Sequence, residues 1–233
     1  MNILDNTPLQ ERIGYTFKDP DLITTALSHT SYANEKRIKK TGSYERLEFL
    51  GDAVLEMISS DYFYKSYPDE PEGNLTKMRA AAVCEQALAI TASDLNLGDH
   101  ILFGKGEEMT GGRKRDSILS DVVEALIGAI YLDGGLEEAG VFIHRFVLND
   151  LDKKKLFYDS KSILQEWVQK DPARELSYRL VSQSGPEHDK QFTVEALLDG
   201  KVIGKGKGHS KKLAEQQAAY DALTNGNIAY AGK

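Results

Sequence analysis

The spacing of apolar residues changes near residue 157, and this change limits the folds open to the chain. Before it, apolar side chains recur every three or four residues, the spacing typical of helices packed on a core. After it, short segments alternate between apolar and polar residues, as strands do. The segments with helical spacing are residues 22–35, 44–67, 75–95, 116–135 and 136–154. The sequence predicts no strand before residue 157, and therefore an all-α N-terminal domain.

The rest of the chain predicts a small α+β domain. Helical segments at its two ends flank three strand-like segments, so the expected order is α-β-β-β-α, with one layer of helices on a three-stranded sheet. Turn signals at Gly185 and Asp199-Gly200 separate the strands. The expected divisions are a first domain, a linker, a second domain and a tail, at residues 1–150, 151–157, 158–227 and 228–233.

Charge is distributed unevenly over the two parts. The whole chain has a formal charge of −7, which divides into −8 for the first 157 residues and +1 for the remainder. This asymmetry indicates two domains with different tasks. No apolar run approaches the roughly 20 residues that span a bilayer, and the N-terminus lacks a signal-peptide pattern. The single cysteine, Cys84, excludes an intrachain disulfide, so we expect a cytoplasmic protein without a membrane partner.

Residues 45–58, ERLEFLGDAVLEMI, predict an amphipathic helix with an acidic side. At about 100° per residue its apolar side is formed by Leu47, Leu50, Val54 and Ile58. The opposite side carries Glu45, Glu48, Asp52 and Glu56. Taken alone, such a row of carboxylates is most simply the solvated face of a helix, since structural acids far outnumber functional ones.

A second acidic pair lies in a more apolar setting. Asp121 and Glu124 are three residues apart and so share one helix face. From Val122 to Leu132 every residue except Glu124 is apolar, Gly or Tyr, and a helix that is apolar all round is buried. A lone buried carboxylate is costly unless it is paired or binds a metal. Gly128, one turn further on, leaves room beside it.

If these two helices pack face to face, four carboxylates converge: Glu48, Asp52, Asp121 and Glu124. Four carboxylates with no His or Cys among them suit a hard cation that prefers oxygen ligands, Mg²⁺ above all. Such a site activates water and stabilises a phosphoryl group during its transfer. Redox di-metal bundles are the alternative, but they use Glu-x-x-His pairs, which the sequence lacks.

The C-terminal helix has features that suit phosphate binding. Gly204, Gly206 and Gly208 give a backbone that allows close approach, and Ser210 can cap the following helix. Lys211 and Lys212 lie in its first turn, where basic residues oppose the helix dipole but attract phosphates. A solvated face is the alternative for such a lysine pair. No aromatic residues are interleaved with the basic ones, so shape recognition of double-stranded RNA fits better than single-strand stacking.

Several of these stretches resemble a known family. ERLEFLGDAVL resembles the signature of the ribonuclease III family. Residues 29–35, 72–80 and 113–135 resemble its other catalytic blocks, in the same order. SKSILQEW, GPEH, KQFTVEALLDG and GKGHSKKLAEQQAA resemble a double-stranded-RNA-binding domain. The resemblance covers nearly the whole chain and follows the domain order of the compact bacterial enzyme.

The resemblance implies a Mg²⁺-dependent endoribonuclease, in which Mn²⁺ also serves as the metal. The metal ligands implied are Glu48, Asp52, Asp121 and Glu124. Asp52 and Glu124 match the two acids at the centre of catalysis, while Glu45 and Glu72 match outer-shell or RNA-contacting acids. Glu56 falls outside the set and is expected to be simply exposed. Phe49 matches an aromatic residue that packs into a partner subunit, which implies a homodimer.

The resemblance also implies the substrate and the products. The residues expected to contact double-stranded RNA are Gln165, Glu166, His188, Ser210, Lys211 and Lys212. Two sites in a dimer would cut opposite strands and leave 5′-phosphate ends with short 3′ overhangs. The implied substrates are ribosomal RNA precursors and other structured transcripts. Two rival functions remain at this point: an RNA-binding regulator that does not cut, and a helical metal-binding or dimerisation protein.

Overall fold

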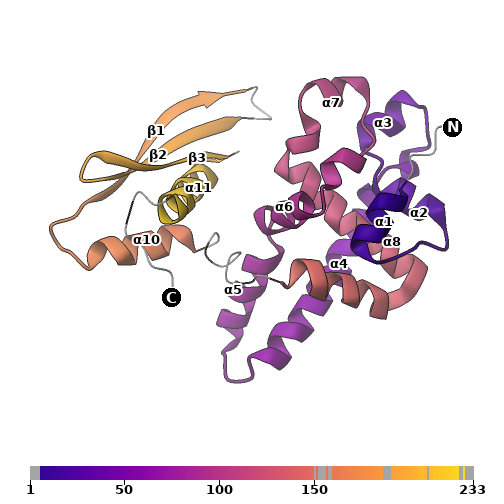
Figure 1. Ribbon diagram of the computed structural model, residues 1–233, viewed down its shortest axis with the longest axis horizontal. Helices are drawn as coiled ribbons and strands as arrows, with labels where there is room; N and C mark the ends of the chain where they lie inside the picture. The colour runs from indigo at the N-terminus through magenta and orange to yellow at the C-terminus, as the bar shows by residue number, and fades with distance from the viewer. Residues whose placement is uncertain are drawn as a thin grey trace. The chain divides into compact units, whose positions relative to one another are not determined.

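The structure, a computed structural model, describes residues 6–149, 151, 156, 159–185, 190–208, 210–225 and 228. The chain divides into two compact units, Met1–Asn149 and Asp150–Lys233. In the described residues the first is helical, and the second is an antiparallel sheet with helices (Figure 1). This confirms the predicted fold class. The finer boundaries stay predictions, because residues 150, 157, 158, 226 and 227 lie outside the described part.

The first unit is built around two long helices. These are α4 (Glu45–Ser66) and α8 (Asp116–Phe142), which pack together more extensively than any other pair in this unit. The shorter helices around them are α1 (Thr7–Ile13), α2 (Pro20–Ala26), α3 (Thr30–Glu35), α5 (Glu72–Val83), α6 (Glu85–Asp94) and α7 (Lys105–Met109). Single turns occur at Lys40–Gly42, Leu97–His100, Gly112–Lys114 and Ile143–Val147. Among the described residues, no helix combines the length and apolar character that a bilayer crossing requires.

Two segments predicted as single helices are divided. Residues 22–35 form α2 and α3 because the chain between them pairs with a distant segment: His29 N–H donates to Leu102 C=O at 3.0 Å, and Leu102 N–H donates to Leu27 C=O at 2.8 Å. Residues 75–95 form parts of α5 and α6, separated by Cys84, whose ψ of 159° is extended. These interruptions depend on contacts that periodicity does not contain.

Other local expectations also needed correction. The short helix α7 lies between Gly104 and Gly111, where the sequence predicted no helix. The helix α1 near the N-terminus was not predicted. Gly135, at φ 87°, interrupts α8 at the boundary between the two segments predicted as separate helices, residues 116–135 and 136–154, because positive φ suits glycine.

Asp133 of α8 binds the segment between α1 and α2 through hydrogen bonds. Its carboxylate accepts hydrogen bonds from the Tyr15 hydroxyl at 2.6 Å and from the Lys18 and Asp19 N–H groups at 2.9 Å. These bonds lower the pKa of Asp133, although burial opposes them, and burial together with Asp133 raises the pKa of Tyr15. Asp19 in turn caps α2 by accepting from the Asp21 N–H, with Pro20 at the first helical position.

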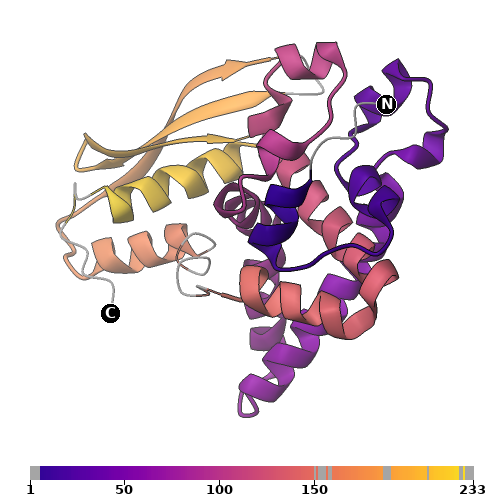
Figure 2. The ribbon, with the colours of Figure 1, turned by 45° about the vertical axis from the view of Figure 1, so that its right-hand side comes forward.

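The second unit packs two helices on one face of a three-stranded antiparallel sheet (Figure 2). In chain order its elements are α10 (Ser160–Gln169), β1 (Leu176–Ser184), β2 (Gln191–Leu198), β3 (Lys201–Gly208) and α11 (Lys211–Thr224). The strands run in the order β1-β2-β3. Asp199 and Gly200 both have positive φ, as a tight hairpin between β2 and β3 requires.

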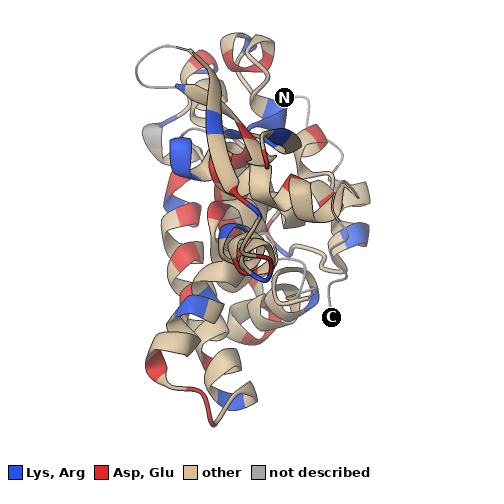
Figure 3. Cartoon of the chain, turned by 90° about the vertical axis from the view of Figure 1, so that its left-hand side faces the viewer, with Lys and Arg blue, Asp and Glu red and all other residues tan. Residues whose placement is uncertain are grey.

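The glycines of β3 serve close packing. A Cβ on Gly204 would lie 2.2 Å from Ala218 C=O, and one on Gly206 would lie 2.2 Å from Ala214 C=O, both on α11. The close backbone approach expected at these glycines is therefore the packing of β3 against α11. Across the outer face, Glu195 accepts from Arg179 at 2.6 Å and pairs with Lys205 at 3.0 Å. Basic and acidic residues occur in both units (Figure 3).

Candidate metal centre

Two glycines set the distance between α4 and α8. A Cβ built on Gly51 of α4 would lie 1.8 Å from the Glu124 C=O of α8, and a Cβ on Gly128 would lie 2.2 Å from the Leu47 C=O. Such separations are far below van der Waals contact, so only glycine allows the two backbones to cross this closely. The crossing packs the side of α4 that carries Leu47 and Gly51 against α8, and it brings the neighbouring Glu48 close to the acids of α8.

Three predicted acids meet at this crossing. Glu48 comes from α4, whereas Asp121 and Glu124 come from α8, and each offers a carboxylate oxygen within 4.8 Å of the other two. All three side chains are half-buried. The apolar residues of α8 around Glu124, among them Val123, Ala125 and Ile127, are fully buried, as the all-round apolar pattern predicted.

The other predicted acids lie elsewhere in the unit. Asp52 is exposed, one turn beyond Glu48, and is not in the group of three, although its charge acts on Glu124. Glu45 is exposed and accepts from the hydroxyls of Thr30 at 3.5 Å and Ser43 at 3.3 Å. Glu72 begins α5 and accepts from Thr76 at 2.9 Å.

Glu56 corrects one expectation. It is not simply exposed: its carboxylate is half-buried and forms an ion pair with Arg79 at 2.9 Å. Arg79 also donates to the Ser60 hydroxyl at 2.7 Å, and that hydroxyl donates to the Glu56 C=O at 2.6 Å. Glu56 therefore has a structural partner that links α4 to α5. Glu72, Arg79 and Ser60 line a pocket of about 350 Å³ between these two helices.

Burial and mutual repulsion disfavour the charged forms of the cluster. Burial, followed by the charges of Asp52 and Asp121, raises the pKa of Glu124 to about 8. Burial and the charge of Asp121 raise the pKa of Glu48. Burial also raises the pKa of Asp121, against a hydrogen bond from Tyr44 that lowers it. Carboxylates this close to one another retain protons unless a cation compensates their charge.

The donor set suits a hard divalent cation. Within the described residues the group of three contains only carboxylates. Mg²⁺ and Ca²⁺ prefer such oxygen ligands, whereas soft metals prefer sulfur ligands. Arg79 of the neighbouring helix α5 pairs with Glu56 and not with the three clustered acids. A cation would therefore compensate the crowding of the three half-buried carboxylates, and the residues present fit the implied metal.

Sequence reasoning missed Tyr44, which lies beside the cluster. This residue is 4% exposed, and its hydroxyl donates to Asp121 Oδ2 at 3.2 Å. Burial and the charge of Asp121 raise the pKa of Tyr44, so the phenol keeps its proton. The position directly before the ERLEFLGD stretch was the available signal, but a tyrosine before a helix resembles an ordinary core residue.

Phe49 lies on the opposite side of α4 from the core. Its side chain is 80% exposed, and Met57, eight residues further along the same helix, is 50% exposed. Ala53 between them is exposed as well. Residues four apart share a helix face, so α4 presents an apolar row to its surroundings.

The residues predicted to contact RNA are accessible where the structure describes them. Gln165 and Glu166 are exposed on α10, and Lys211 and Lys212 are exposed in the first turn of α11. Ser210 caps α11 by accepting from the Leu213 N–H at 3.1 Å, which confirms the predicted cap. His188 lies outside the described residues.

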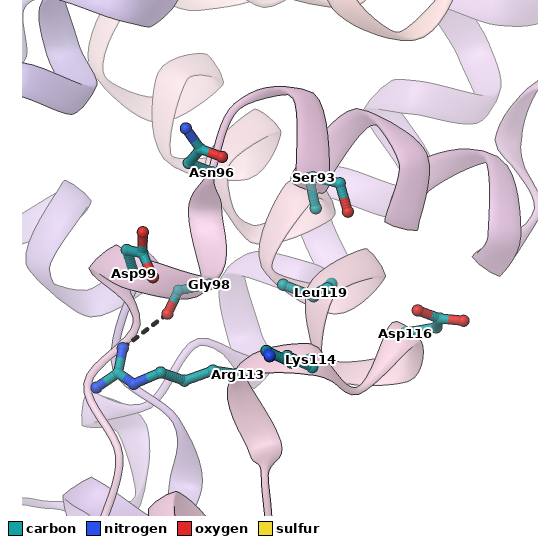
Figure 4. A pocket seen from close by; sticks show the side chains of 9 residues that line it. Ser93, Asn96, Gly98, Asp99, Arg113, Lys114, Asp116 and Leu119 are labelled. Atoms are coloured by element: carbon teal, nitrogen blue, oxygen red, sulfur yellow. Dashed lines mark hydrogen bonds between the residues drawn. The ribbon is translucent and has the colours of Figure 1, made fainter.

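A separate pocket in the first unit holds none of the predicted residues. It measures about 250 Å³ and lies between the end of α6 and the start of α8 (Figure 4). Its lining includes Asn96, Asp99, Lys114 and Asp116. Arg113 at its edge is already engaged, since it donates to the Gly98 C=O at 2.7 Å.

Comparison with known families identifies both units. A family model described as "Ribonuclease-III-like" matches residues 19–151, and one described as "Double-stranded RNA binding motif" matches residues 160–225. "Ribonuclease 3" of Desulforamulus reducens is 50% identical over 218 residues, which is 92% of this chain and 89% of that protein. "Ribonuclease 3" of Streptococcus gordonii is 47% identical over 229 residues, 97% of this chain and 98% of that protein.

Solved structures give the same result for the first unit. The nuclease domain of ribonuclease III from Campylobacter jejuni matches with a TM-score of 0.58 and 43% identity. The match covers 61% of this chain and 96% of that one. A second structure of the same domain gives a TM-score of 0.57.

Proposed function

The chain belongs to the ribonuclease III family of double-stranded-RNA-specific endoribonucleases, and on this premise we propose that it is a Mg²⁺-dependent enzyme that hydrolyses both RNA strands. The observation that carries the proposal is the meeting of Glu48, Asp121 and Glu124 within 4.8 Å at the α4–α8 crossing. The solvated face of a single helix does not explain this cluster, because its acids come from two helices and are half-buried.

The proposed metal ligands are the three clustered acids together with Asp52, one turn along α4. Bound there, Mg²⁺ or Mn²⁺ would supply an activated water and compensate the charge of a phosphoryl group in transfer. The chain's own contribution is to hold the carboxylates at a fixed separation and in a partly dry setting, where electrostatic effects are stronger than in water. Asp52 and Glu124 are the proposed catalytic residues, with Glu45 and Glu72 as outer-shell or RNA-contacting acids.

A homodimer is the proposed assembly. The apolar row of Phe49, Ala53 and Met57 on α4 is exposed in the single chain, and an exposed apolar row marks an interaction site. The nuclease domain of ribonuclease III from Campylobacter jejuni has a structurally flexible region that is involved in dimer formation. Two sites in a dimer would cut opposite strands and leave 5′-phosphate ends with short 3′ overhangs.

The second unit is the proposed RNA-binding domain. The proposed contacts are Gln165, Glu166, His188, Ser210, Lys211 and Lys212. The exposed lysines in the first turn of α11 lie at a helix N-terminus, a position suited to phosphates. We propose ribosomal RNA precursors and other structured transcripts as substrates. The single unpaired thiol, Cys84, is compatible with the cytoplasm as the proposed location.

The test is cleavage of a long, fully paired RNA in Mg²⁺ by the native chain and by Glu124→Gln and Asp52→Asn. We expect short duplex products from the native chain and rates lower by more than about 100-fold in both variants, a loss at least as large as that caused by outer-shell changes. Glu137→Gln, which removes an exposed acid from the same helix α8, serves as the matched control and should cut normally.

RNA binding is measured in parallel, with Ca²⁺ in place of Mg²⁺. All four proteins should bind the duplex equally, because the proposed RNA-binding domain is the second unit. If the native chain binds duplex RNA but leaves it whole in both Mg²⁺ and Mn²⁺, the nuclease proposal is wrong and a non-cleaving regulator takes its place.

A further inference from the structure

We propose that Tyr44 is a positioning residue that orients the carboxylate of Asp121 for metal binding. The inference rests on the proposed function, because it takes Asp121 as a metal ligand. Tyr44 touches neither substrate nor metal in this scheme and acts only through Asp121. Its phenol O–H donates to Asp121 Oδ2 at 3.2 Å, across 77 positions of sequence.

Tyr44 connects the two helices that carry the acids. Its backbone C=O accepts hydrogen bonds from the N–H groups of Leu47, at 2.8 Å, and Glu48, at 2.9 Å, at the start of α4. The same residue therefore fixes the backbone of one cluster acid and the side chain of another. A bond between α4 and α8 at this point ties the position of Asp121 to that of Glu48.

The tyrosine is itself held from several directions. Its N–H donates to the Ser28 C=O at 2.9 Å, and its ring packs against that of His29 with 5.7 Å between centroids. His29 packs in turn against Phe103 at 5.2 Å, and its Nδ1 accepts from the Ser31 N–H at 3.1 Å. A residue that is 4% exposed and fixed in this way has little rotational freedom.

The physical reason for the role lies in how metal ligands are oriented. A carboxylate on a short side chain rotates unless a neighbouring group fixes it, and the second partners of metal ligands typically supply that constraint. Among the described residues, Tyr44 is the side chain that donates to the Asp121 carboxylate. Losing this donor would leave Asp121 in several orientations, of which only some face Glu48 and Glu124.

The test compares two matched variants, Tyr44→Phe and Tyr15→Phe. Each removes one phenol O–H that donates to an aspartate carboxylate, at 3.2 Å to Asp121 and at 2.6 Å to Asp133, and each keeps the ring. Asp133 is not part of the carboxylate cluster. Binding of Mn²⁺ to the full chain without RNA is measured by electron paramagnetic resonance, with Glu124→Gln identifying the cluster site.

We expect Tyr44→Phe to weaken Mn²⁺ binding about tenfold, within the range found for partners of metal ligands. Tyr15→Phe should bind Mn²⁺ as the native chain does, although both variants lose a hydrogen bond and some thermal stability. In cleavage assays, Tyr44→Phe should require more Mg²⁺ for half-maximal rate and recover most of the native rate at saturating Mg²⁺.

Three results would overturn the inference. Unchanged Mn²⁺ affinity in Tyr44→Phe shows that Asp121 is oriented without the phenol. Equal loss in both variants shows a general effect of stability. A lower maximal rate with an unchanged Mg²⁺ midpoint shows a role outside metal binding. If instead the native chain binds no Mn²⁺ that Glu124→Gln abolishes, the proposed function itself fails, and the inference fails with it.

Discussion

Glu124 is a charged residue type in an apolar stretch of helix, and its proposed role as a metal ligand gives a chemical reason for this. It is the one acidic or basic residue between Val122 and Leu132, in a stretch of α8 that is otherwise largely buried apolar surface. Burial there removes water from the carboxylate and disfavours its charged form, and this raises the pKa of Glu124 to about 8. The same position in an ordinary helix core would be filled at less cost by leucine.

The raised pKa predicts that the metal-free protein loses stability as pH rises. The folded state holds a proton on Glu124 up to about pH 8, whereas the unfolded state releases it near the ordinary value of 4.5. This contribution is therefore complete below pH 4.5 and is lost as pH rises through 8. After allowance for the half-exposed setting we expect a loss of about 2 kcal/mol, or roughly 4–8 °C in Tm.

The measurement is the Tm of the native chain and of Glu124→Gln, with a chelator present, at pH 5.5 and pH 8.5. The variant cannot titrate at this position, so its Tm should fall less over the same interval. Saturating Mg²⁺ should reduce the decline in the native chain, because a cation that binds only the folded state stabilises it. Parallel declines in the two proteins would contradict the prediction.

At the scale of elements, periodicity predicted the helices that bury a face and missed the features set by distant contacts. The extent of α4, Glu45–Ser66, follows the predicted segment 44–67 closely. The break between α2 and α3 depends on Leu102, more than 70 residues away, and no local pattern contains it. Tyr44 was missed for the same reason, since its partner Asp121 lies on another helix.

The α4–α8 crossing predicts opposite effects for two Gly→Ala changes. Gly51→Ala places a Cβ 1.8 Å from the Glu124 C=O, so the helices must separate. We expect a net loss of about 1–3 kcal/mol, even though alanine favours helix. Gly140→Ala, on α8, would meet only Ile58 at 4.0 Å, an ordinary contact. That variant should gain up to about 1 kcal/mol.

Urea denaturation of both variants measures these changes, and Mn²⁺ binding shows whether the cluster has moved. Gly51→Ala should lose Mn²⁺ affinity because Glu48 and Glu124 are carried apart, while Gly140→Ala should keep it. Native stability and native Mn²⁺ affinity in Gly51→Ala would show that the two helices tolerate a wider crossing.

On the scale of the whole molecule, the proposed function assigns different tasks to the two units, in keeping with their different charges. The acidic part, with −8 of the total charge, repels RNA unless cations are bound, since bound ions reverse the local field. The second part is near neutral overall but exposes Lys211 and Lys212 at a helix N-terminus. The sequence predicted the two domains through the change in periodicity and their different tasks through the uneven charge. The predicted RNA contact of the GPEH turn stays a prediction, because most of that turn lies outside the described part.

We expect removal of a lysine from the first turn of α11 to weaken RNA binding and to leave metal binding unchanged. Lys211→Ala and Lys212→Ala should each weaken duplex RNA binding and lower the slope of log affinity against log salt by about 1, the share of one phosphate contact. Lys201→Ala, which removes another exposed lysine at the start of β3, is the matched control. Filter binding over a range of KCl concentrations gives the slopes.

Mn²⁺ binding should be native in all three lysine variants, because their lysines lie in the other unit. Equal slopes for Lys201→Ala and Lys211→Ala would mean that the lysines act through net charge alone. The start of α11 would then have no special part in binding.

The junction between α5 and α6 has a practical consequence for chemical labelling. Cys84 is the only cysteine in the chain, it is half-buried, and burial raises the pKa of its thiol. A thiol reagent therefore reacts slowly with the closed junction and faster whenever the two helices part. Its labelling rate reports local opening at this point directly, with no other thiol to replace and no probe to introduce.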